Sequence, residues 1–519
     1  MSNIQKKAKT LALVILDGWG LWGEEKGNAI AQADTPVMAK LYKKYPNIQI
    51  QASEKYVGLP DGQPGNSEAG HMNIGAGRVI EQDAVTISRS INNGTFFKNP
   101  AFLQAASHAE KHKSDIHLIG LLSNGTSPHS HDDHILSLLS FFISKTKQNI
   151  YLHLFTDGRD SPPYSALKIL AQYNTVFNSD RVKIASVMGR FYAMDRKKAW
   201  DRTRKAYEAI VIGKGYKAKS AVEAVNQAYN RGESDEFILP TVISKNKKPL
   251  GPINDNDSVV FFNLRSDRAR QLTKAFVQKD FEKKNGGTFK RQVVPKNLIF
   301  VALTDFGPDL GGVLTAYPGI DIPDTLPIAL KDVRQLYIAE TEKYAHVTYF
   351  INGGYDHPIA GEDRIDIPSK DVLSYDKKPE MSTKEITDKV IQCLKNDKYD
   401  FFCINFAAPD MVGHTGNLKA GIKAVEAVDK HLGRIVDEFL KFRGTVIVTA
   451  DHGNVEEMIN LKTQEIDTEH SINPVPFIIV SDKKYKLKKT GRLSHIAPTI
   501  LDIMGIDKPI LMKDNSLIK

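Results

Sequence analysis

The sequence predicts an α/β protein made of two domains, one of which is inserted into the other. At 519 residues the chain is too long for a single ordinary core. Short apolar runs alternate with amphipathic segments along most of it, which is typical of a mainly parallel sheet covered by helices. An apolar run that ends in Asp17 matches the runs before Asp410 and Asp451 better than any run in the middle. We therefore expect one discontinuous domain, built from both ends of the chain.

The N-terminal part begins with a short strand and then becomes rich in glycine. The apolar run 11–16 predicts a strand that is closed by Asp17, and residues 34–45 have the apolar spacing of a helix. Glycines and prolines exclude a strand over residues 57–75. Within that segment Asn66 and Ser67 are good N-cap residues for a helix that starts near Glu68. Backbone N–H groups at such a helix start favour phosphate.

The rest of the chain repeats the strand and helix pattern. Strands are expected at 116–122, 150–155, 182–188, 258–264 and 298–304, and residues 307–319 are expected to form a linker. Further strands are expected at 345–350, 401–406, 445–449 and 477–480, with a helix over 418–440. The predicted domains are therefore residues 1–82 together with 317–519, and an insertion of residues 83–316.

Composition narrows the class of protein. Apolar residues make up 41% and charged residues 25%, as in soluble globular proteins, and two cysteines give no disulfide framework. No apolar run approaches the ~20 residues of a membrane span. The net charge of +9 suits nucleic acid, an anionic membrane or small anionic substrates. Because no basic and aromatic stripe and no zinc finger is present, a nucleic-acid partner is the weaker interpretation.

Metal-ligand residues stand in turns of the expected discontinuous domain, most of them just after apolar runs. Each has a simpler explanation when taken alone, such as a polar turn that closes a strand. Asp410 and His414 are four residues apart, which places both on one face of a helical turn. Three aspartates and three histidines exceed one tetrahedral site and suggest two metal ions. The mixed oxygen and nitrogen set favours Mn²⁺, with Zn²⁺ or Mg²⁺ as alternatives. The set consists of Asp17, Asp410, His414, Asp451, His452 and His470.

Ser67 is the candidate nucleophile. An unaided serine hydroxyl is a weak nucleophile, and metal coordination is one way to activate it. The alternative is that Ser67 only caps the helix, and without the metal-ligand residues this would be preferred.

A second set of residues suits anions. Arginines that follow strands can bind carboxylate or phosphate with two parallel hydrogen bonds, although a salt-bridged surface explains any single one of them. Lys343, expected just before a strand, could neutralise a transferring phosphoryl group. The set consists of His129, His131, Arg159, Asp160, Arg190, Arg196, Arg265, Arg268 and Lys343.

Together these segments resemble the cofactor-independent (2,3-bisphosphoglycerate-independent) phosphoglycerate mutases of the alkaline phosphatase superfamily. The resemblance covers nearly the whole chain, and in combination its motifs are highly specific. They are residues 16–20, 65–71, 73–78, 157–160, 189–196, 339–346, 405–414 and 450–454.

The resemblance implies two three-layer α/β domains, an alkaline-phosphatase-like metal domain with a substrate-binding domain inserted into it. One Mn²⁺ would be held by Asp410, His414 and His470, and the other by Asp17, Ser67, Asp451 and His452. Zn²⁺, Mg²⁺ or Co²⁺ could take their place. The two ions are expected roughly 3.5–5 Å apart. Ser67 would pass through a phosphoserine. Substrate would be held by His129, Arg159, Asp160, Arg190, Arg196, Arg265, Arg268 and Lys343.

A few positions depart from the family pattern. Residues 124–131 are one residue longer than usual, which leaves His131 as an alternative to His129. Ser266 replaces a common proline, and Glu469 stands where threonine is usual. None of these changes removes a ligand. We expect a monomer in the cytoplasm that binds neither nucleic acid nor membrane.

The mechanism that follows is an in-line transfer of phosphate. Ser67, its pKa lowered by a metal ion, attacks the phosphorus of 3-phosphoglycerate, and Lys343 neutralises charge on the transferring group. Asp160 moves the protons of the glycerate hydroxyls, and the arginines retain the glycerate until it takes the phosphate back as 2-phosphoglycerate. The inserted domain is expected to close so that water is excluded. The rival functions are a phosphatase, sulfatase or other phosphomutase with the same metal core, and a basic nucleic-acid-binding protein.

Overall fold

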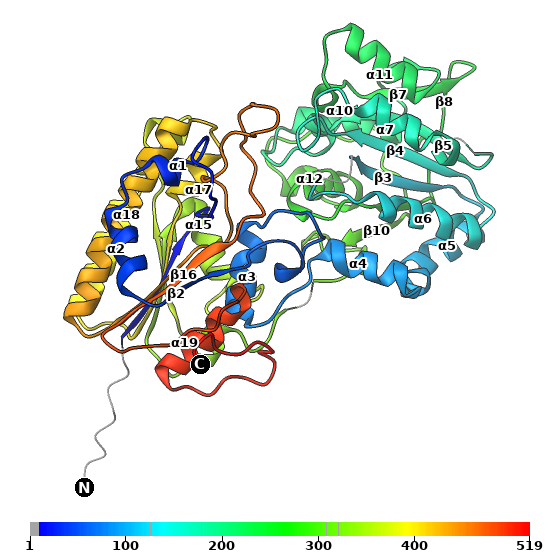
Figure 1. Ribbon diagram of the computed structural model, residues 1–519. Coiled ribbons are helices and arrows are strands. Elements are labelled where there is room, and N and C mark those ends of the chain that lie inside the picture. The colour runs from blue at the N-terminus through cyan, green and yellow to red at the C-terminus, as the bar shows by residue number, and fades with distance from the viewer. Residues whose placement is uncertain (1–9, 124–126, 178, 308, 320) are drawn as a thin grey trace. The chain divides into compact units, whose positions relative to one another are not determined.

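The computed structural model describes residues 10–123, 127–177, 179–307, 309–319 and 321–519. The chain divides into two compact units, Met1–Gln82 with Ile320–Lys519, and Asp83–Gly319. Each unit has an α/β sheet of its own (Figure 1). Among the described residues every hydrophobic core cluster lies entirely within one unit or the other. We call Met1–Gln82 with Ile320–Lys519 the discontinuous unit and Asp83–Gly319 the inserted unit.

The sheet of the discontinuous unit is parallel at its centre and antiparallel at one edge. Its strand order is β13-β12-β14-β1-β15-β16-β2, and the antiparallel pairs are β15 with β16 and β16 with β2. The bounds are β1 (Leu11–Leu16), β2 (Asn47–Ile50), β12 (Gln335–Glu340), β13 (Asp363–Ile367), β14 (Phe401–Phe406), β15 (Thr445–Thr449) and β16 (Val475–Val480).

β1 lies in the middle of this sheet, paired with β14 on one side and β15 on the other. All its residues are buried, which explains why it is a continuous apolar run rather than an alternating one. Because β1, β14 and β15 are parallel and in register, their carboxyl ends meet at one edge of the sheet. The predicted strands 11–16, 401–406 and 445–449 are confirmed residue for residue.

Helices cover both faces of this sheet. The long helix α18 turns Val425, Val428, Leu432 and Ile435 inward at the spacing of an amphipathic helix. Figure 1 shows α18 and α2 on one side of the sheet and α3 and α19 on the other. The helices are α1 (Ala29–Gln32), α2 (Pro36–Lys44), α3 (Ser67–Ala76), α14 (Leu326–Ala329), α15 (Thr341–Ala345), α16 (Thr383–Lys395), α17 (Ala408–Gly413), α18 (Leu418–Lys441) and α19 (Ile496–Met504).

The sheet of the inserted unit has the order β11-β10-β9-β3-β4-β5-β7-β6, with β8 paired to β7, and is parallel from β11 to β5. Its strands are β3 (Ile116–Leu122), β4 (Ile150–Thr156), β5 (Val182–Gly189), β6 (Tyr216–Ala218), β7 (Thr241–Lys245), β8 (Lys248–Pro249), β9 (Ser258–Phe261), β10 (Ile299–Thr304) and β11 (Val313–Tyr317).

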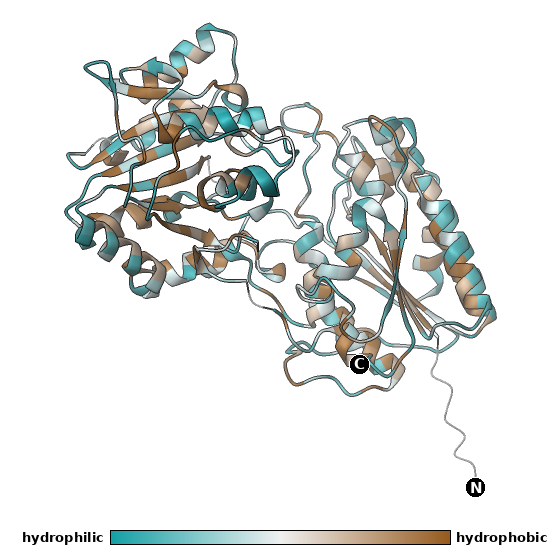
Figure 2. Cartoon of the chain, turned by 180° about the vertical axis from the view of Figure 1, so that it is seen from behind, coloured by the Kyte–Doolittle hydropathy of each residue, from teal (hydrophilic) through white to brown (hydrophobic). Residues whose placement is uncertain are grey.

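The helices of the inserted unit complete its α/β layers. In both units hydrophobic colour concentrates on the strands, and hydrophilic colour on the outer faces of helices (Figure 2). The helices are α4 (Asp83–Asn92), α5 (Pro100–His112), α6 (Asp132–Lys145), α7 (Ala166–Gln172), α8 (Asn174–Phe177), α9 (Arg190–Ala193), α10 (Trp200–Val211), α11 (Ala221–Asn230), α12 (Ser266–Val277) and α13 (Phe281–Lys284).

Two local predictions are wrong. The segment 345–350, expected to be a strand, is the end of α15 followed by a single π-helical segment, His346–Phe350. The segment 307–319, expected to be a linker, contains β11, which pairs in parallel with β10. The inserted unit therefore extends to Gly319, past the expected boundary at residue 316.

Candidate active site

The ligand-type residues of the discontinuous unit meet at the carboxyl edge of its central strands. Asp17 follows β1, Asp410 lies in α17 after β14, and Asp451 with His452 follows β15. Gly18 has a φ of 75°, and a Cβ at this position would lie 2.8 Å from the Cα of Asp410. The glycine therefore allows the turn after β1 to pack directly against α17.

The ligand atoms of these residues lie close together in two overlapping groups. One group is Asp17, Asp451 and His452, and the other is Asp410, His452 and His470, with all atoms of a group within 4.8 Å of one another. His414 joins the second group, since its Nε2 lies 3.1 Å from Nε2 of His470 and 3.4 Å from Oδ1 of Asp410. Residues far apart in the sequence thus form one continuous cluster.

In each of the three histidines Nδ1 faces a backbone carbonyl, which directs Nε2 toward the ligand cluster. Nδ1 of His414 donates to the carbonyl of Thr468 at 2.7 Å, and Nδ1 of His470 donates to that of Gly65 at 2.8 Å. Nδ1 of His452 lies 3.3 Å from its neighbouring carbonyl, that of Gly453. A neutral imidazole that carries its proton on Nδ1 leaves the Nε2 lone pair free, as in histidines that bind metal.

The carboxylates are equally suited to a cation. Oδ2 of Asp451 is buried and makes no hydrogen bond of ordinary geometry among the described residues, and its ion-pair neighbour is Nδ1 of His71, 3.2 Å away. Burial, together with the neighbouring Asp451 carboxylate, raises the pKa of Asp17 to about 7. A buried cluster of carboxylates is costly unless cations compensate it. Hard oxygen donors with imidazole nitrogens therefore fit divalent ions such as Mn²⁺ or Zn²⁺.

Ser67 opens helix α3, with Asn66 as its N-cap, because the Asn66 side chain accepts from the N–H of Ala69 at 2.9 Å. Its Oγ lies 2.9 Å from Nε2 of His452 and 3.3 Å from Oδ1 of Asp17. Helix capping is therefore done by Asn66, and the Ser67 hydroxyl faces the ligand cluster.

Lys343 is buried in the same cluster. Its Nζ lies 2.6 Å from each of three atoms, namely Oδ1 of Asp17, Oγ of Ser67 and Oδ2 of Asp410. Burial lowers the pKa of an ammonium, but here the carboxylates of Asp17 and Asp410 outweigh it and hold the Lys343 pKa above its ordinary value. The lysine was expected to precede a strand, whereas it follows β12 and lies in α15.

The inserted unit has its own polar cluster, at the carboxyl ends of β3, β4, β5 and β9. Arg190, directly after β5, is buried and donates from Nη1 to Asp157 and Asp160 at 2.6 Å each. Although burial raises the pKa of Asp160, the Arg190 guanidinium holds it below its usual range. Asp160 is therefore held in its ionised form by Arg190.

The arginines of this cluster lie close enough to affect one another. Burial, then the positive charges of Arg190, Arg196 and Arg159, lower the pKa of Arg268 to about 10. Arg196 and Arg265 both approach Asp267, Arg196 at 2.7 Å and Arg265 at 4.0 Å. The five arginines, Arg159, Arg190, Arg196, Arg265 and Arg268, outnumber the carboxylates paired with them, those of Asp157, Asp160, Asp267 and Glu236. The excess of positive charge suits a small anion.

His129, not His131, lies among these arginines. Burial, then the charges of Arg190 and Arg265, lower the pKa of His129 to about 3, so its imidazole is neutral. His131 instead precedes α6 and stacks on His134 at 4.8 Å between ring centroids. Residues 124–126 of this segment lie outside the described residues.

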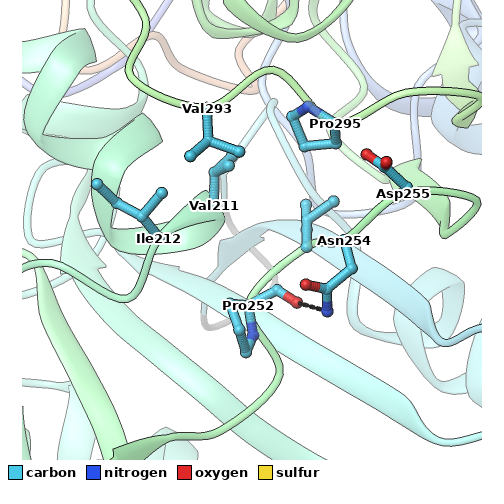
Figure 3. A pocket seen from close by; sticks show the side chains of 8 residues that line it. Val211, Ile212, Pro252, Asn254, Asp255, Val293 and Pro295 are labelled. Carbon is cyan, nitrogen blue, oxygen red and sulfur yellow. Dashed lines mark hydrogen bonds between the residues drawn. The ribbon is translucent and has the colours of Figure 1, made fainter.

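The pocket drawn in Figure 3 belongs to the opposite edge of the same sheet. It is lined by Val211, Ile212, Val293, Pro295 and the segment 252–255, and the last three lie on the chain that leads into β9 and β10. The side-chain amide of Asn254 donates a 2.9 Å hydrogen bond to the carbonyl of Pro252 there. The pocket contains no predicted site residue and offers no cluster of titratable side chains.

Four residues of the ligand cluster's surroundings carry no role predicted from the sequence. Asn405 donates to Oδ2 of Asp17 at 2.7 Å, and Asn454 donates to Oδ1 of Asp410 at 3.0 Å. His71 approaches Asp451, and Glu456 accepts the N–H groups of Gly20 and Asn454. The apolar run before residue 405 and the Asp-His-Gly-Asn turn at 451–454 indicate that Asn405 and Asn454 lie near the site. They do not predict which carboxylates these side chains contact.

The fold and the site define a metalloenzyme. The sequence model of the Metalloenzyme superfamily matches residues 9–508. In the described part of the chain, none of the helices is long and apolar enough to cross a membrane.

Curated relatives narrow the family. The chain is 48% identical over 515 residues to the 2,3-bisphosphoglycerate-independent phosphoglycerate mutase of Clostridioides difficile, which covers 98% of this chain and 99% of that protein. It is also 48% identical to phosphoglycerate mutase 1 of the same kind from Methanosarcina acetivorans, with 98% of each chain covered. The chain belongs to the family of 2,3-bisphosphoglycerate-independent phosphoglycerate mutases.

A solved structure agrees with this assignment. The crystal structure of Leishmania mexicana phosphoglycerate mutase at low cobalt concentration matches with a TM-score of 0.81 and 31% identity, over 99% of this chain and 98% of that one. The predicted fold class of two α/β domains is confirmed.

Proposed function

We propose that this chain interconverts 3-phosphoglycerate and 2-phosphoglycerate without 2,3-bisphosphoglycerate, through a phosphoserine at Ser67. The observation that carries the proposal is the Ser67 hydroxyl, 2.6 Å from the Lys343 ammonium and 2.9 Å from His452 inside a cluster of metal-ligand residues. Family membership and the separate arginine cluster support the same reaction.

We propose that two divalent ions are held as predicted. Asp410, His414 and His470 bind one ion, and Asp17, Ser67, Asp451 and His452 bind the other. Mn²⁺ suits this mixed oxygen and nitrogen set, with Zn²⁺, Mg²⁺ or Co²⁺ as substitutes. When bound, such ions lower the pKa of a coordinated hydroxyl and neutralise phosphoryl charge.

In the proposed reaction Ser67 acts in its deprotonated form, and its oxygen attacks phosphorus and forms the serine ester as the bond to the C3 oxygen of glycerate breaks. Lys343 neutralises charge on the transferring group. Asp160, kept ionised by Arg190, takes the proton of the C2 hydroxyl and returns a proton to the C3 oxygen. The deprotonated C2 oxygen then takes the phosphoryl group from Ser67, and the Ser67 oxygen leaves in the deprotonated form in which it started.

The arginine cluster supplies the substrate specificity in this proposal. Arg159, Arg190, Arg196, Arg265 and Arg268, with neutral His129, bind the carboxylate and phosphate of the substrate. Retention of glycerate between the two transfers is what distinguishes a mutase from a phosphatase with the same metal core. We propose further that the enzyme acts as a monomer in the cytoplasm, without nucleic-acid or membrane partners.

The test is Ser67→Ala in the presence of Mn²⁺, assayed for 2-phosphoglycerate formed from 3-phosphoglycerate. We expect turnover to fall by at least about 10³-fold, as for loss of other catalytic nucleophiles. Ser494→Ala, at another buried serine of the discontinuous unit, serves as the control and should keep its turnover. Appreciable turnover by Ser67→Ala would show that Ser67 is not the nucleophile. Release of free phosphate by the native enzyme would favour a phosphatase over a mutase.

A further inference from the structure

His71 and Asn405 join the two aspartates that flank Ser67. Both side chains are fully buried, and neither is among the proposed metal ligands. Asn405 stands in β14 and His71 in α3, one helical turn after Ser67. Their contacts run in one chain from Asp17 through Asn405 and His71 to Asp451.

The contacts fix the hydrogen positions along this chain. Nδ1 of His71 lies 2.9 Å from the carbonyl of Ser67 and 3.2 Å from Oδ2 of Asp451. Both neighbours can only accept, so Nδ1 carries the proton. Nε2 of His71 lies 3.1 Å from Nδ2 of Asn405, which must then be the donor.

Asn405 acts only as a donor. Its amide nitrogen has two hydrogens and two acceptors, Nε2 of His71 and Oδ2 of Asp17 at 2.7 Å. Its Oδ1 is buried without a hydrogen-bond partner among the described residues. The Asn405 side chain therefore leaves its oxygen unpaired in the core, while its two N–H groups connect Asp17 with His71.

From this geometry we infer that His71 and Asn405 are positioning residues that hold Asp17 and Asp451 in place for one metal ion. The inference rests on the metal centre of the proposed function. His71 orients Oδ2 of Asp451 and, through the Ser67 carbonyl, the first turn of α3. Asn405 orients Oδ2 of Asp17. Removal of groups that orient metal ligands typically weakens metal binding 10- to 100-fold.

The experiment measures Mn²⁺ binding to the metal-stripped full-length protein by isothermal titration calorimetry. We expect His71→Ala and Asn405→Ala each to weaken Mn²⁺ binding at one of two sites by about 10- to 100-fold. Because the two residues belong to one chain, the double variant should lose less than the product of the two single losses.

Conservative and control variants separate positioning from general damage. His71→Asn places an amide N–H near the position of Nδ1, and should bind Mn²⁺ more tightly than His71→Ala. Asn73→Ala is the matched control, because Asn73 is a buried asparagine of the same helix that donates to the carbonyls of Val57 and Ala69. It should lower the melting temperature without changing the Mn²⁺ dissociation constant.

Kinetics provide a second readout. The turnover number of His71→Ala and Asn405→Ala should recover as Mn²⁺ is raised, and KM for 3-phosphoglycerate should stay within about twofold, because the substrate-binding arginines are untouched. If His71→Ala does not fold, His71→Asn and Asn405→Ala decide the matter by the same binding measurement.

The outcomes are distinct. The inference is overturned if Asn405→Ala and the folded His71 variants bind Mn²⁺ within about threefold of the native protein, or if Asn73→Ala weakens binding as much as they do. If the native protein binds no divalent ion, the proposed metal centre itself fails, which is a different result.

Discussion

At the scale of single residues, Lys343 is a buried ammonium held between two carboxylates and the Ser67 hydroxyl. Its ammonium is within 2.6 Å of two buried carboxylates, those of Asp17 and Asp410. Removing one partner of a buried ion pair leaves an uncompensated charge, which typically costs about 3–5 kcal/mol. Lys343→Met should therefore lower the free energy of unfolding by that amount in metal-free protein, and less when Mn²⁺ is present.

The measurement is urea unfolding with EDTA and with Mn²⁺. Lys384→Met, at an exposed lysine that pairs with Asp388, is the control and should change the unfolding midpoint little. Lys343→Met should also lower turnover by about 10²–10³-fold, because no ammonium then neutralises the negative charge of the transferring phosphoryl group. Turnover close to the native rate would contradict that role.

His134 predicts a pH dependence of stability in the inserted unit. Burial, and then the neighbouring His131, lower its pKa to about 3. Because the pKa in the unfolded chain is near 6.5, the unfolded state binds the extra proton, so this stability is complete above that pH and is lost as the pH falls toward 3. Between pH 7 and 5 the loss should be about 2 kcal/mol.

The check compares urea unfolding of the native protein and His134→Gln at pH 7 and pH 5. The variant should be less stable at pH 7, since the contact of His134 with Ser88 is altered, but its stability should fall less with acid. Equal losses for both proteins would show that His134 is not responsible.

Single residues also show how much of the site can be predicted from the sequence. Asp451 and His452 could be predicted as a site because chemistry-bearing side chains at strand ends are visible in the chain itself. The role of Asn405 could not, because it depends on a donor contact with Asp17 from a residue 388 positions away. His129 and His131 are equivalent by spacing, and only packing among the arginines separates them.

At the scale of elements, helix α3 brings Ser67 to the metal-ligand residues through a close approach at Gly70. A Cβ at Gly70 would lie 2.7 Å from the backbone oxygen of Asp451. Gly70→Ala should push α3 away from the turn after β15 and move Ser67 relative to His452. A misplacement of about 1 Å can cost about 10²-fold in rate, and we expect a loss of that order in turnover.

Gly23→Ala is the matched control, because nothing lies within 4 Å of a Cβ at that position. Steady-state rates and Mn²⁺ binding are measured for both variants. Native turnover in Gly70→Ala would mean that α3 tolerates the extra methyl group, and that its position does not set the rate.

The errors in predicting elements have a physical origin. The sequence of residues 345–350 is rich in β-branched and aromatic side chains, which usually favour a strand. The actual strand β12 precedes it, and its apolar centre, 336–339, is only a few residues long between Gln335 and Glu340. In contrast, β1 and β15 are continuous apolar runs because parallel neighbours bury both faces, and such runs are predictable.

At the scale of the whole molecule, the chemistry is divided between the two units. The metal-ligand residues, Ser67 and Lys343 all belong to the discontinuous unit, and the arginine cluster belongs to the inserted unit. The ends of the inserted unit lie together, since Ser90 of α4 contacts the Tyr317 hydroxyl of β11 at 2.5 Å, and Asn99 donates to the carbonyl of Ala316 at 2.7 Å. An insertion with adjacent ends can fold around its own core.

We therefore expect residues 83–319, produced alone, to unfold cooperatively in urea and to bind no Mn²⁺. Residues 1–82 joined to 320–519 by a short glycine and serine linker should bind Mn²⁺ with near-native affinity but form no 2-phosphoglycerate, since they lack the arginine cluster. Each fragment has a hydrophobic core of its own, so neither needs the other to bury apolar surface. Circular dichroism, calorimetry and the mutase assay test the three statements separately. An unfolded fragment 83–319 would show that the two units depend on each other for stability. Mutase activity in the protein made of residues 1–82 and 320–519 would show that substrate specificity resides with the metal-ligand residues.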